Sequence, residues 1–315
     1  MFIDDCSSAQ LKIGRVLDVR RLRLLREVSL RGTLAEVAAA LHQSPSAVSQ
    51  QLSLLEHEVG TPLLRKVGRG VELTPPAVVL VEHTERIMLE LEQAATAVAA
   101  AVGEVAGTVR VAAFQSAAIA FMPQMLARLA EDHPLVRVTM SQRSPEQALH
   151  ALHARELDLV IAVEYPGRAA APHPDLDRQP VTTDRLWLAV PRSPDWQSIT
   201  ALDAATDVPW AMEPLSADSR AWTEQLCRAH GFEPDVRYES DDLETHAALV
   251  ESGHAVAVLP DLMVLRRPPA ARLLRLPGDP RRTAYTVTRR TLTASPAVQA
   301  CREALMATVN DGVGN

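Results

Sequence analysis

Apolar side chains recur at helical spacing between residues 33 and 59, which indicates two short helices joined by a turn. In the second helix, residues 44–58, one stripe is apolar and consists of Val48, Leu52, Leu55 and Val59. The opposite stripe carries short polar side chains, namely Ser46, Ser49, Gln50, Ser53 and His57. Hydroxyls and an amide can hydrogen-bond base edges in a major groove, which predicts a DNA-contacting helix. An ordinary solvated face is the alternative explanation.

Turn and cap residues mark the ends of these helices. Gly32 can end one helix, and Thr33 can cap the next over residues 34–41, because its hydroxyl accepts an orphan backbone N–H. Ser44, followed by a proline, is suited to capping the helix after the turn. Upstream, the apolar spacing of residues 17–30 predicts a third helix, with its arginines spread outside the inward face. Three short helices can share one small core.

Residues 61–73 alternate in polarity and hold glycines where a hairpin would turn, which predicts a β-hairpin wing. Arg65, Lys66 and Arg69 would project from this wing toward phosphates, because residues 44–58 contain no Lys or Arg. Residues 1–75 hold ten Lys and Arg against eight Asp and Glu, although the whole chain has a net charge of −7. A chain that is acidic overall can therefore still bind DNA through its basic end. A basic hairpin with no partner is the alternative.

Residues 17–77 resemble the winged helix-turn-helix of LysR-type transcriptional regulators, and the resemblance extends along almost the whole chain. The matching positions, in chain order, are Asp18, Arg20, Leu22, Gly32, Thr33, Ala38 to Leu41, Ser44, Ala47, Val48, Ser49, Leu55, Glu56, Gly60, Pro62, Leu63, Lys66, Arg69, Leu73 and Thr74. The sequence departs from the family at Leu34, Val37, Pro45 and Leu64. Pro45 lacks a side chain that could contact a base, so no base contact is expected there.

The predicted function is a DNA-binding transcriptional regulator that responds to a small molecule. The expected DNA-binding residues are Thr33, Ser44, Ser46, Ser49, Gln50, Ser53, Arg65, Lys66 and Arg69. Among them, the serines at 46, 49 and 53 and Gln50 would contact bases, whereas Thr33 and the wing cations would contact phosphates. Paired subunits would span a near-palindromic operator, as a dimer or a tetramer, and RNA polymerase is a candidate partner.

A long helix is expected to link this region to the rest of the chain, over residues 76–105. Steps of four and three give it an apolar seam at Leu80, Thr84, Ile87, Leu91, Ala94, Val98 and Ala101, which suits a partner helix. Its apolar run is about half of the roughly 20 residues that a membrane span needs. Residues 1–16 are expected to be a loose extension with no signal-peptide pattern, which favours a cytoplasmic protein.

Strands and helices alternate after this linker, which predicts an α/β domain with largely parallel sheets over residues 106–315. The expected elements include one helix over 117–130 and a strand over 185–190. The length suits two lobes. The resemblance implies a fold similar to periplasmic binding proteins with an effector in the cleft. Lobe I would comprise residues 108–163 and 262–310, and lobe II residues 164–261.

Loops that follow strands and precede helices are candidate ligand contacts in such folds. These loops contribute the expected effector-binding residues Ser116, Gln142, Glu164, Glu213 and Asp241, although each could be an ordinary helix cap or solvated loop residue. Three acidic candidates favour a cationic ligand, whereas helix N-termini favour an anion, so the sequence leaves the charge of the effector open.

Other chemistry is less well supported by the sequence. Cys6, Cys227 and Cys301 lack metal-type spacing, although a redox pair between the last two is conceivable. His150 and His153 share a helix face without clustered further ligands, which favours surface histidines over a metal site. No catalytic or phosphate-binding motif is found, so neither an enzyme nor a cofactor is expected. The competing class is a solute-binding receptor or enzyme whose first 75 residues only contact protein.

Overall fold

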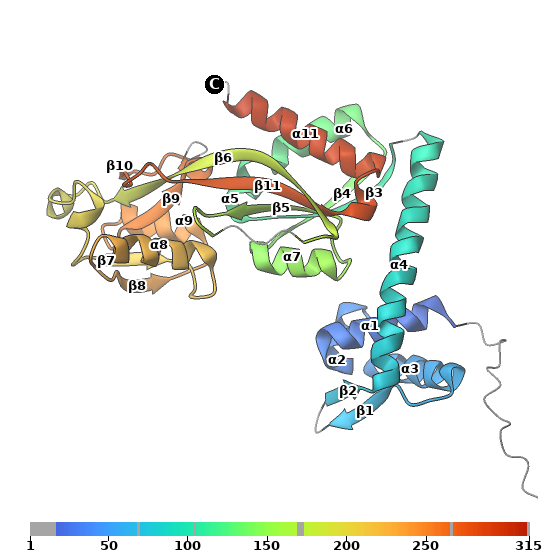
Figure 1. Ribbon diagram of the computed structural model, residues 1–315. Helices are drawn as coiled ribbons and strands as arrows, with labels where there is room; N and C mark the ends of the chain where they lie inside the picture. Colours follow the sequence, from blue (N-terminus) through green and yellow to red (C-terminus); the bar gives the residue numbers. More distant parts are fainter. Residues whose placement is uncertain (1–16, 68–69, 104, 169–172, 265–266, 314–315) are drawn as a thin grey trace, which may run out of the picture. The chain divides into compact units, whose positions relative to one another are not determined.

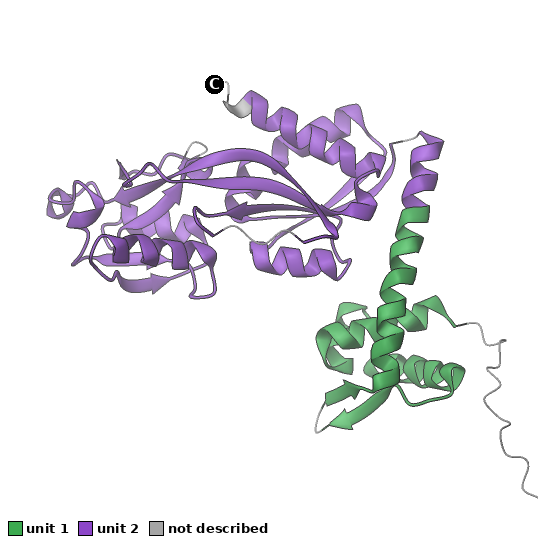
Figure 2. Cartoon of the chain, viewed as in Figure 1, with its two compact units in different colours: residues 1–94 green, residues 95–315 purple. Residues whose placement is uncertain are grey.

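The computed structural model describes residues 17–67, 70–103, 105–168, 173–264 and 267–313 (Figure 1). The chain forms two compact units, residues 1–94 and 95–315, which divide within one long helix (Figure 2). The expected extension over residues 1–16 lies outside the described residues. No helix in the described part of the chain is long and apolar enough to cross a membrane.

The N-terminal unit is a winged helix-turn-helix. Its elements are α1 (Val19–Arg31), α2 (Leu34–Ala40), α3 (Pro45–Val59), β1 (Leu64–Val67), β2 (Gly70–Leu73) and the first part of α4 (Pro75–Val102). Side chains of Asp18, Thr33 and Ser44 accept backbone N–H groups at the starts of α1, α2 and α3. Gly32 and Gly60 end α1 and α3 at φ 78° and 81°, in the left-handed region that favours glycine. The predicted helix boundaries are therefore confirmed to within a residue or two.

A small apolar core joins the three helices and the wing. Leu25, Val48 and Leu55 are fully buried in it, and Leu52 is 2 % exposed. Val59 differs from the prediction, because it is 36 % exposed at the last residue of α3, one turn beyond the buried stripe. The stripe ends there because Gly60 redirects the chain.

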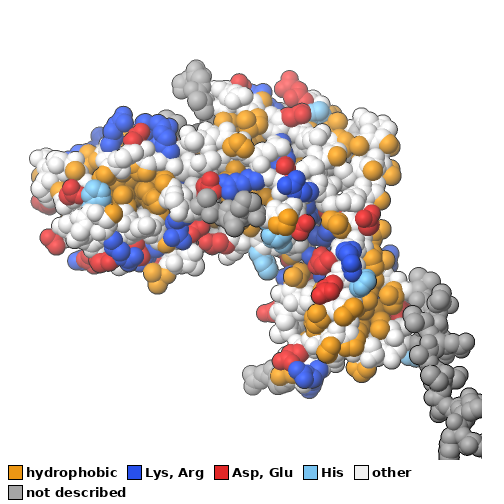
Figure 3. Space-filling view, viewed as in Figure 1, with side chains coloured by type: hydrophobic (Ala, Val, Ile, Leu, Met, Phe, Trp, Pro, Cys, Tyr) orange, Lys and Arg blue, Asp and Glu red, His pale blue; other side chains and the backbone are white. Residues whose placement is uncertain are grey.

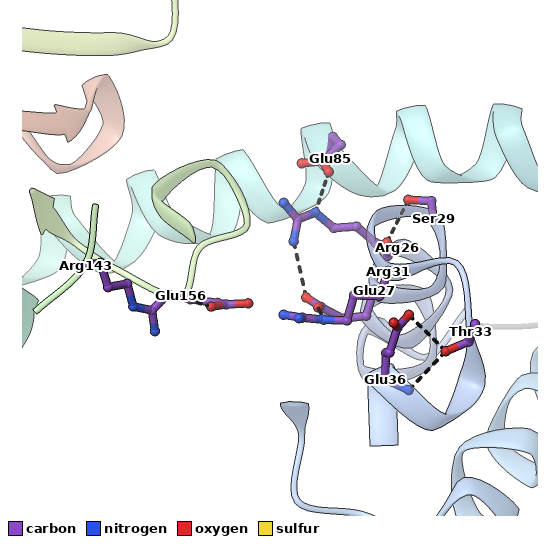
Figure 4. Close-up of polar contacts among 9 residues, drawn as sticks. All are labelled: Arg26, Glu27, Ser29, Arg31, Thr33, Glu36, Glu85, Arg143 and Glu156. Atoms are coloured by element: carbon purple, nitrogen blue, oxygen red, sulfur yellow. Dashed lines mark hydrogen bonds and ion pairs between the residues drawn. The ribbon is translucent and has the colours of Figure 1, made fainter. Parts of the chain in front are cut away.

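Charged residues of α1 also differ from the prediction that its arginines lie outside the core. Arg26 and Glu27 are 3 % and 2 % exposed. Figure 4 shows Arg26 contacting Glu27 beside it and Glu85 of α4, while Arg31 Nε donates to Glu27 Oε2 at 3.0 Å. A buried ionic group needs such partners, so this cluster fastens α1 to the linker helix.

The linker helix has two parts with different packing. Near its start, Ala77 and Thr84 are fully buried and Leu80 packs against the winged helix-turn-helix core. Further along, Ile87 and Leu91 are 36 % and 50 % exposed. The first part of the predicted seam is therefore occupied by the chain's own core, and only the later positions are available to a partner.

The C-terminal unit is an α/β domain. Its strands are β3 (Gly107–Ala113), β4 (Val136–Gln142), β5 (Leu159–Glu164), β6 (Leu176–Val190), β7 (Pro209–Met212), β8 (Asp235–Glu239), β9 (Ala257–Pro260), β10 (Arg272–Arg275) and β11 (Arg281–Arg289). Its helices are α5 (Gln115–Ala120), α6 (Met122–Asp132), α7 (Pro145–His153), α8 (Asp218–Ala229), α9 (Leu243–Glu251), α10 (Asp261–Val264) and α11 (Pro296–Val313), with short 3-10 turns at 194–196, 202–204 and 290–292.

Two elements differ from their predicted extent. The single helix expected over 117–130 is interrupted at Phe121, because Pro123 lies in the first turn of α6 and cannot continue a preceding helix. The strand expected over 185–190 begins nine residues earlier, at Leu176. Its first half contains Pro180 and several polar residues, and the pairing with β11 shifts register next to this proline.

The large sheet has the order β10-β6-β11-β5-β3-β4, with β9 also paired to β6. Only β3 with β4 and β3 with β5 are parallel in this sheet, whereas β6, β9, β10 and β11 pair antiparallel. The prediction of largely parallel sheets is therefore wrong for the large sheet, and it holds only for β3 with its neighbours β4 and β5 and for the separate β7-β8 pair. The long strands β6 and β11 run between the two ends of the domain in Figure 1.

Separate buried cores define two lobes. Lobe I is built around β3 and β5 with α6 and α11, and lobe II around the end of β6 with β7, β9, α8 and α9. Residues 176–181 pack into lobe I, whereas residues 271–276 pack into lobe II. Both segments therefore lie in the opposite lobe from the one predicted, because β6 and β10 take part in the sheet across the predicted boundaries.

Candidate DNA interface and effector cavity

The outer face of α3 displays the polar side chains expected to contact bases. Ser46, Ser49, Gln50 and Ser53 are all exposed, on the side away from buried Val48. The side chains of Ser49, Gln50 and Ser53 take no part in capping α3, so they are available to a binding partner. The Ser46 hydroxyl lies 3.0 Å from the hydroxyl of the cap residue Ser44. The helix thus presents hydroxyls and one carboxamide to the surroundings, as major-groove contact requires.

Two predicted DNA-binding residues have structural tasks of their own. Ser44 Oγ accepts the Ala47 N–H at 3.2 Å, which caps α3. Thr33 Oγ1 accepts the Glu36 N–H at 3.2 Å and donates to Glu36 Oε2 at 2.9 Å (Figure 4). The Thr33 hydroxyl hydrogen is therefore engaged beside a carboxylate, and a phosphate contact would require this contact to open.

The wing places its cations unequally. Arg65 is 70 % exposed but is paired with Glu72 across the hairpin. Lys66 is exposed and has no ion-pair or hydrogen-bond partner within the described part of the chain. Arg69 lies outside the described residues. Of the two wing cations that the structure describes, Lys66 is thus the one whose charge is free to meet a phosphate.

A cavity of about 270 Å³ lies in the C-terminal unit and is lined by both lobes. Four of the five expected effector-binding residues line it: Ser116, Gln142, Glu213 and Asp241. Glu164 is not among the lining residues. Its Oε2 is paired instead with Arg178 Nη2 at a distance of 2.5 Å, and Arg178 is not a lining residue either. The loops after β3, β4, β7 and β8 therefore converge on one site, as expected for strand ends in an α/β fold.

Arg282 is a charged residue of the cavity wall that was not among the predicted effector-binding residues. Its side chain is 3 % exposed, and its Nε donates to Asp184 Oδ2 at 2.7 Å. It also donates to Ser116 Oγ at 2.5 Å and to the Tyr165 hydroxyl at 3.3 Å. Although burial opposes ionisation, the Asp184 carboxylate raises the pKa of Arg282. An arginine at an inward position of strand β11 was the available signal, since such a residue needs buried partners.

One side chain joins the two lobes at the edge of the cavity. Gln115 of lobe I donates from Nε2 to Asp242 Oδ1 and accepts the Leu243 N–H at 2.8 Å, both at the start of α9 in lobe II. Asp242 also caps α9. If the two lobes moved apart, the hydrogen bonds of the Gln115 amide to the start of α9 would have to break.

The cysteines and histidines do not form further sites in the described residues. Cys227 and Cys301 lie in the cores of different lobes, and burial raises the pKa of each thiol to about 12. Such thiols are poorly reactive, which argues against a redox pair. His153 packs edge-on against His173, and no group of three metal-ligating side chains occurs in the described part of the chain.

A winged helix-turn-helix followed by a two-lobed α/β domain with a cavity between its lobes defines a DNA-binding regulator with a ligand-binding module. Residues 19–77 match the family model for the bacterial regulatory helix-turn-helix protein of the lysR family, and residues 103–310 match the LysR substrate binding domain. The chain therefore belongs to the LysR family. It is a LysR-type DNA-binding transcriptional regulator with a C-terminal effector-binding domain.

Individual relatives agree with this assignment. The regulator DgdR of Burkholderia cepacia is 30 % identical over 272 residues, which are 85 % of each chain. The dual regulator GltC of Bacillus subtilis is 26 % identical over 78 % of this chain and 81 % of its own. Full-length OxyR from Pseudomonas aeruginosa shares the fold with a TM-score of 0.66 at 18 % identity, covering 94 % of this chain and 95 % of its own. DgdR and GltC are both named as transcriptional regulators.

Proposed function

We propose that α3 enters the major groove and contacts bases through Ser46, Ser49, Gln50 and Ser53. The observation that carries this assignment is the exposed row of short polar side chains directly opposite the buried stripe of the same helix. Gln50 is the largest of these groups and can bind a base edge with two hydrogen bonds. A structure of CbnR complexed with its target DNA has the same fold, with a TM-score of 0.50 at 23 % identity over 93 % of this chain and 99 % of its own.

The wing supplies the phosphate contacts in this proposal. Lys66 contributes directly, and Arg65 does so when it leaves Glu72 for a phosphate. Arg69 is included from the sequence alone. Ser44 lies at the N-terminus of α3, and the positive end of a helix favours a nearby phosphate. Thr33 contributes only if its contact with Glu36 opens.

The effector binds in the cavity between the lobes, in contact with Ser116, Gln142, Glu213 and Asp241. Its support is the convergence of four strand-end loops from both lobes on one cavity. Glu164 is not part of the proposed site, since Arg178 neutralises it elsewhere. Binding between the lobes would change their separation, which is a physical route from ligand to transcription.

Two copies of the chain associate through the later part of α4. Hydrophobic side chains gather over this helix in the N-terminal unit, as Figure 3 shows, and Ile87 and Leu91 are exposed there. An antiparallel or parallel helix pair would bury them. Paired units would bind a near-palindromic operator, and a regulator of chromosomal genes would act in the cytoplasm.

The test is binding to the DNA upstream of the chain's own gene, measured by gel shift with the full-length protein. We expect Gln50→Ala to weaken binding by about 1–3 kcal/mol and to relax the sequence preference, because a bidentate base contact is lost. Gln51→Ala is the matched control, since Gln51 is half-buried and its Oε1 accepts from Arg21 Nε at 3.1 Å. Equal losses on random and upstream DNA, or equal effects of both variants, would contradict base contact by Gln50.

A further inference from the structure

More acidic than basic side chains line the effector cavity. Four carboxylates line it, from Glu146, Glu213, Asp218 and Asp241. Two guanidinium groups line it, from Arg143 and Arg282. The two lobes both contribute acids, because Glu146 comes from α7 in lobe I and the other three come from lobe II.

The partners of these groups increase the imbalance. Arg282 is neutralised by buried Asp184 behind the cavity wall. Arg143 is paired with Glu156, with 3.4 Å between Nη1 and Oε2 (Figure 4). On the acidic side, only Asp218 is paired, with Arg168 Nη2 at 2.7 Å.

Three carboxylates therefore face the cavity without a counterion. The side-chain carboxylates of Glu146, Glu213 and Asp241 have no ion pair or hydrogen bond among the residues that the structure describes. The backbone carbonyl of Glu213 accepts from Arg220 Nη1 at 3.1 Å. Burial and then the nearby charge of Asp218 raise the pKa of Glu146, although the charge of Arg168 opposes this rise more strongly than that of Glu213 adds to it. Glu146 of lobe I thus lies close enough to Asp218 and Glu213 of lobe II for like-charge repulsion.

Helix geometry explains only part of this arrangement. Glu146 and Asp218 stand in the first turns of α7 and α8, where the helix dipole favours an acid whatever the ligand. Glu213 has no such position, since it follows strand β7 in a loop. Its carboxylate serves no described contact, so a ligand is the group that would use it.

Ser219 is also among the lining residues, but its Oγ is inaccessible to solvent and therefore does not face the cavity space. The remaining lining is partly apolar, with Phe114, Val163 and Leu243. The volume equals roughly nine water molecules in liquid, which suits a small metabolite.

We propose that the effector is a small amine, either an organic cation or a zwitterion, whose protonated nitrogen binds between Glu146, Glu213 and Asp241. This inference rests on the proposed function of the cavity as the effector site. The ammonium group neutralises carboxylates from both lobes at once, and its binding therefore draws the lobes together. An anionic effector would instead add a like charge to an uncompensated acidic wall.

The experiment compares three probes of four carbon atoms at equal ionic strength, using the full-length protein and isothermal titration calorimetry. The probes are putrescine as dication, γ-aminobutyrate as zwitterion and succinate as dianion. We expect at least one amine to bind at least tenfold more tightly than succinate. We expect Glu213→Gln to weaken amine binding about tenfold, since a charged hydrogen-bond partner is lost. Glu131→Gln on α6 is the matched control, because Glu131 is exposed and lies outside the cavity lining.

The outcomes separate this inference from the proposed function. Absence of binding by both amines, or amine binding that Glu213→Gln leaves unchanged, would overturn the amine class. Succinate binding that is lost in Gln142→Ala would also overturn it, while supporting the cavity as the effector site. The gel shift with Gln50→Ala tests DNA contact separately, because that residue belongs to the other unit of the chain.

Discussion

The two units of this regulator present their functional side chains in opposite ways. In the N-terminal unit, Ser49, Gln50 and Ser53, the proposed base contacts, are exposed on the outer side of a small core. In the C-terminal unit, the polar groups that line the cavity come from segments between residues 114 and 282, and two of them, Ser116 and Arg282, are buried. An exposed face therefore needs a surface pattern alone, whereas a cavity needs each buried charge to be matched.

Buried ion pairs occur in both units but have different surroundings. Arg26 and Glu27 fasten α1 to α4 behind the DNA-binding face and contact no proposed ligand. Arg282 and Asp184 lie between the long strands β6 and β11, and Arg282 also holds Ser116 in the cavity wall. Only the second pair couples stability to the shape of a binding site. This difference can be tested by mutation.

The largest effect is expected from Arg282→Met. The substitution leaves the fully buried Asp184 carboxylate without its cation, so we expect a loss of about 3–5 kcal/mol in the free energy of unfolding of the C-terminal unit. Native-state hydrogen exchange of β11 amides measures this unit separately from the other. DNA binding by the N-terminal unit should persist at temperatures where the variant remains folded.

Arg281→Met is the control on the same strand. Arg281 is 45 % exposed in its side chain, and its Nη2 lies 3.8 Å from Asp279 Oδ2. A weak exposed pair of this kind contributes less than about 1 kcal/mol. If both variants lower the free energy of unfolding by the same amount, the buried Arg282–Asp184 pair stabilises the C-terminal unit no more than an exposed pair does.

The same contrast explains which features could be predicted from the sequence. The helices and wing of the N-terminal unit were predictable because each cap and each apolar stripe lies within a few residues of the next. Thr33, Ser44 and Gly60 all mark helix ends where their chemistry indicates them. The predicted outward position of Arg26 was wrong, because its partner Glu85 lies 59 residues away.

The cavity was predictable only in part. Strand ends indicated Ser116 and Glu213, because loops after parallel strands meet at one edge. Glu164 also follows this rule, yet it is paired with Arg178 outside the cavity lining. Arg282 was missed, since its partners Asp184 and Ser116 are 98 and 166 residues away. Local spacing carries no information about such contacts.

A smaller effect is expected where the two faces of α3 are compared. Leu52→Ala opens a cavity in the core of the N-terminal unit, so we expect a loss of about 2–5 kcal/mol in its free energy of unfolding. Ser53→Ala, at the next residue on the exposed face, should change stability by less than about 0.5 kcal/mol. Hydrogen exchange of α3 amides gives both values.

Under conditions where both variants are fully folded, Ser53→Ala should lose more DNA affinity than Leu52→Ala, although it loses less stability. Ser53→Ala removes a proposed base contact and leaves the core intact, whereas Leu52→Ala leaves the outer face unchanged. Gel shifts at low temperature on upstream DNA measure this. A loss of affinity in Leu52→Ala alone would show that Ser53 only solvates the helix.

The smallest effect is expected in the wing, where Lys66 and Arg65 differ in their partners. Each phosphate contact contributes about 0.9 to the slope of log affinity against log salt, so Lys66→Ala should lower the slope of a dimer by roughly 2. Arg65→Ala should change the slope less, because Glu72 already holds the Arg65 guanidinium. Binding titrations between roughly 50 and 200 mM salt, which bracket physiological ionic strength, measure both slopes. Equal decreases would show that Arg65 exchanges Glu72 for a phosphate on binding, and an unchanged slope in Lys66→Ala would exclude the wing lysine from the interface.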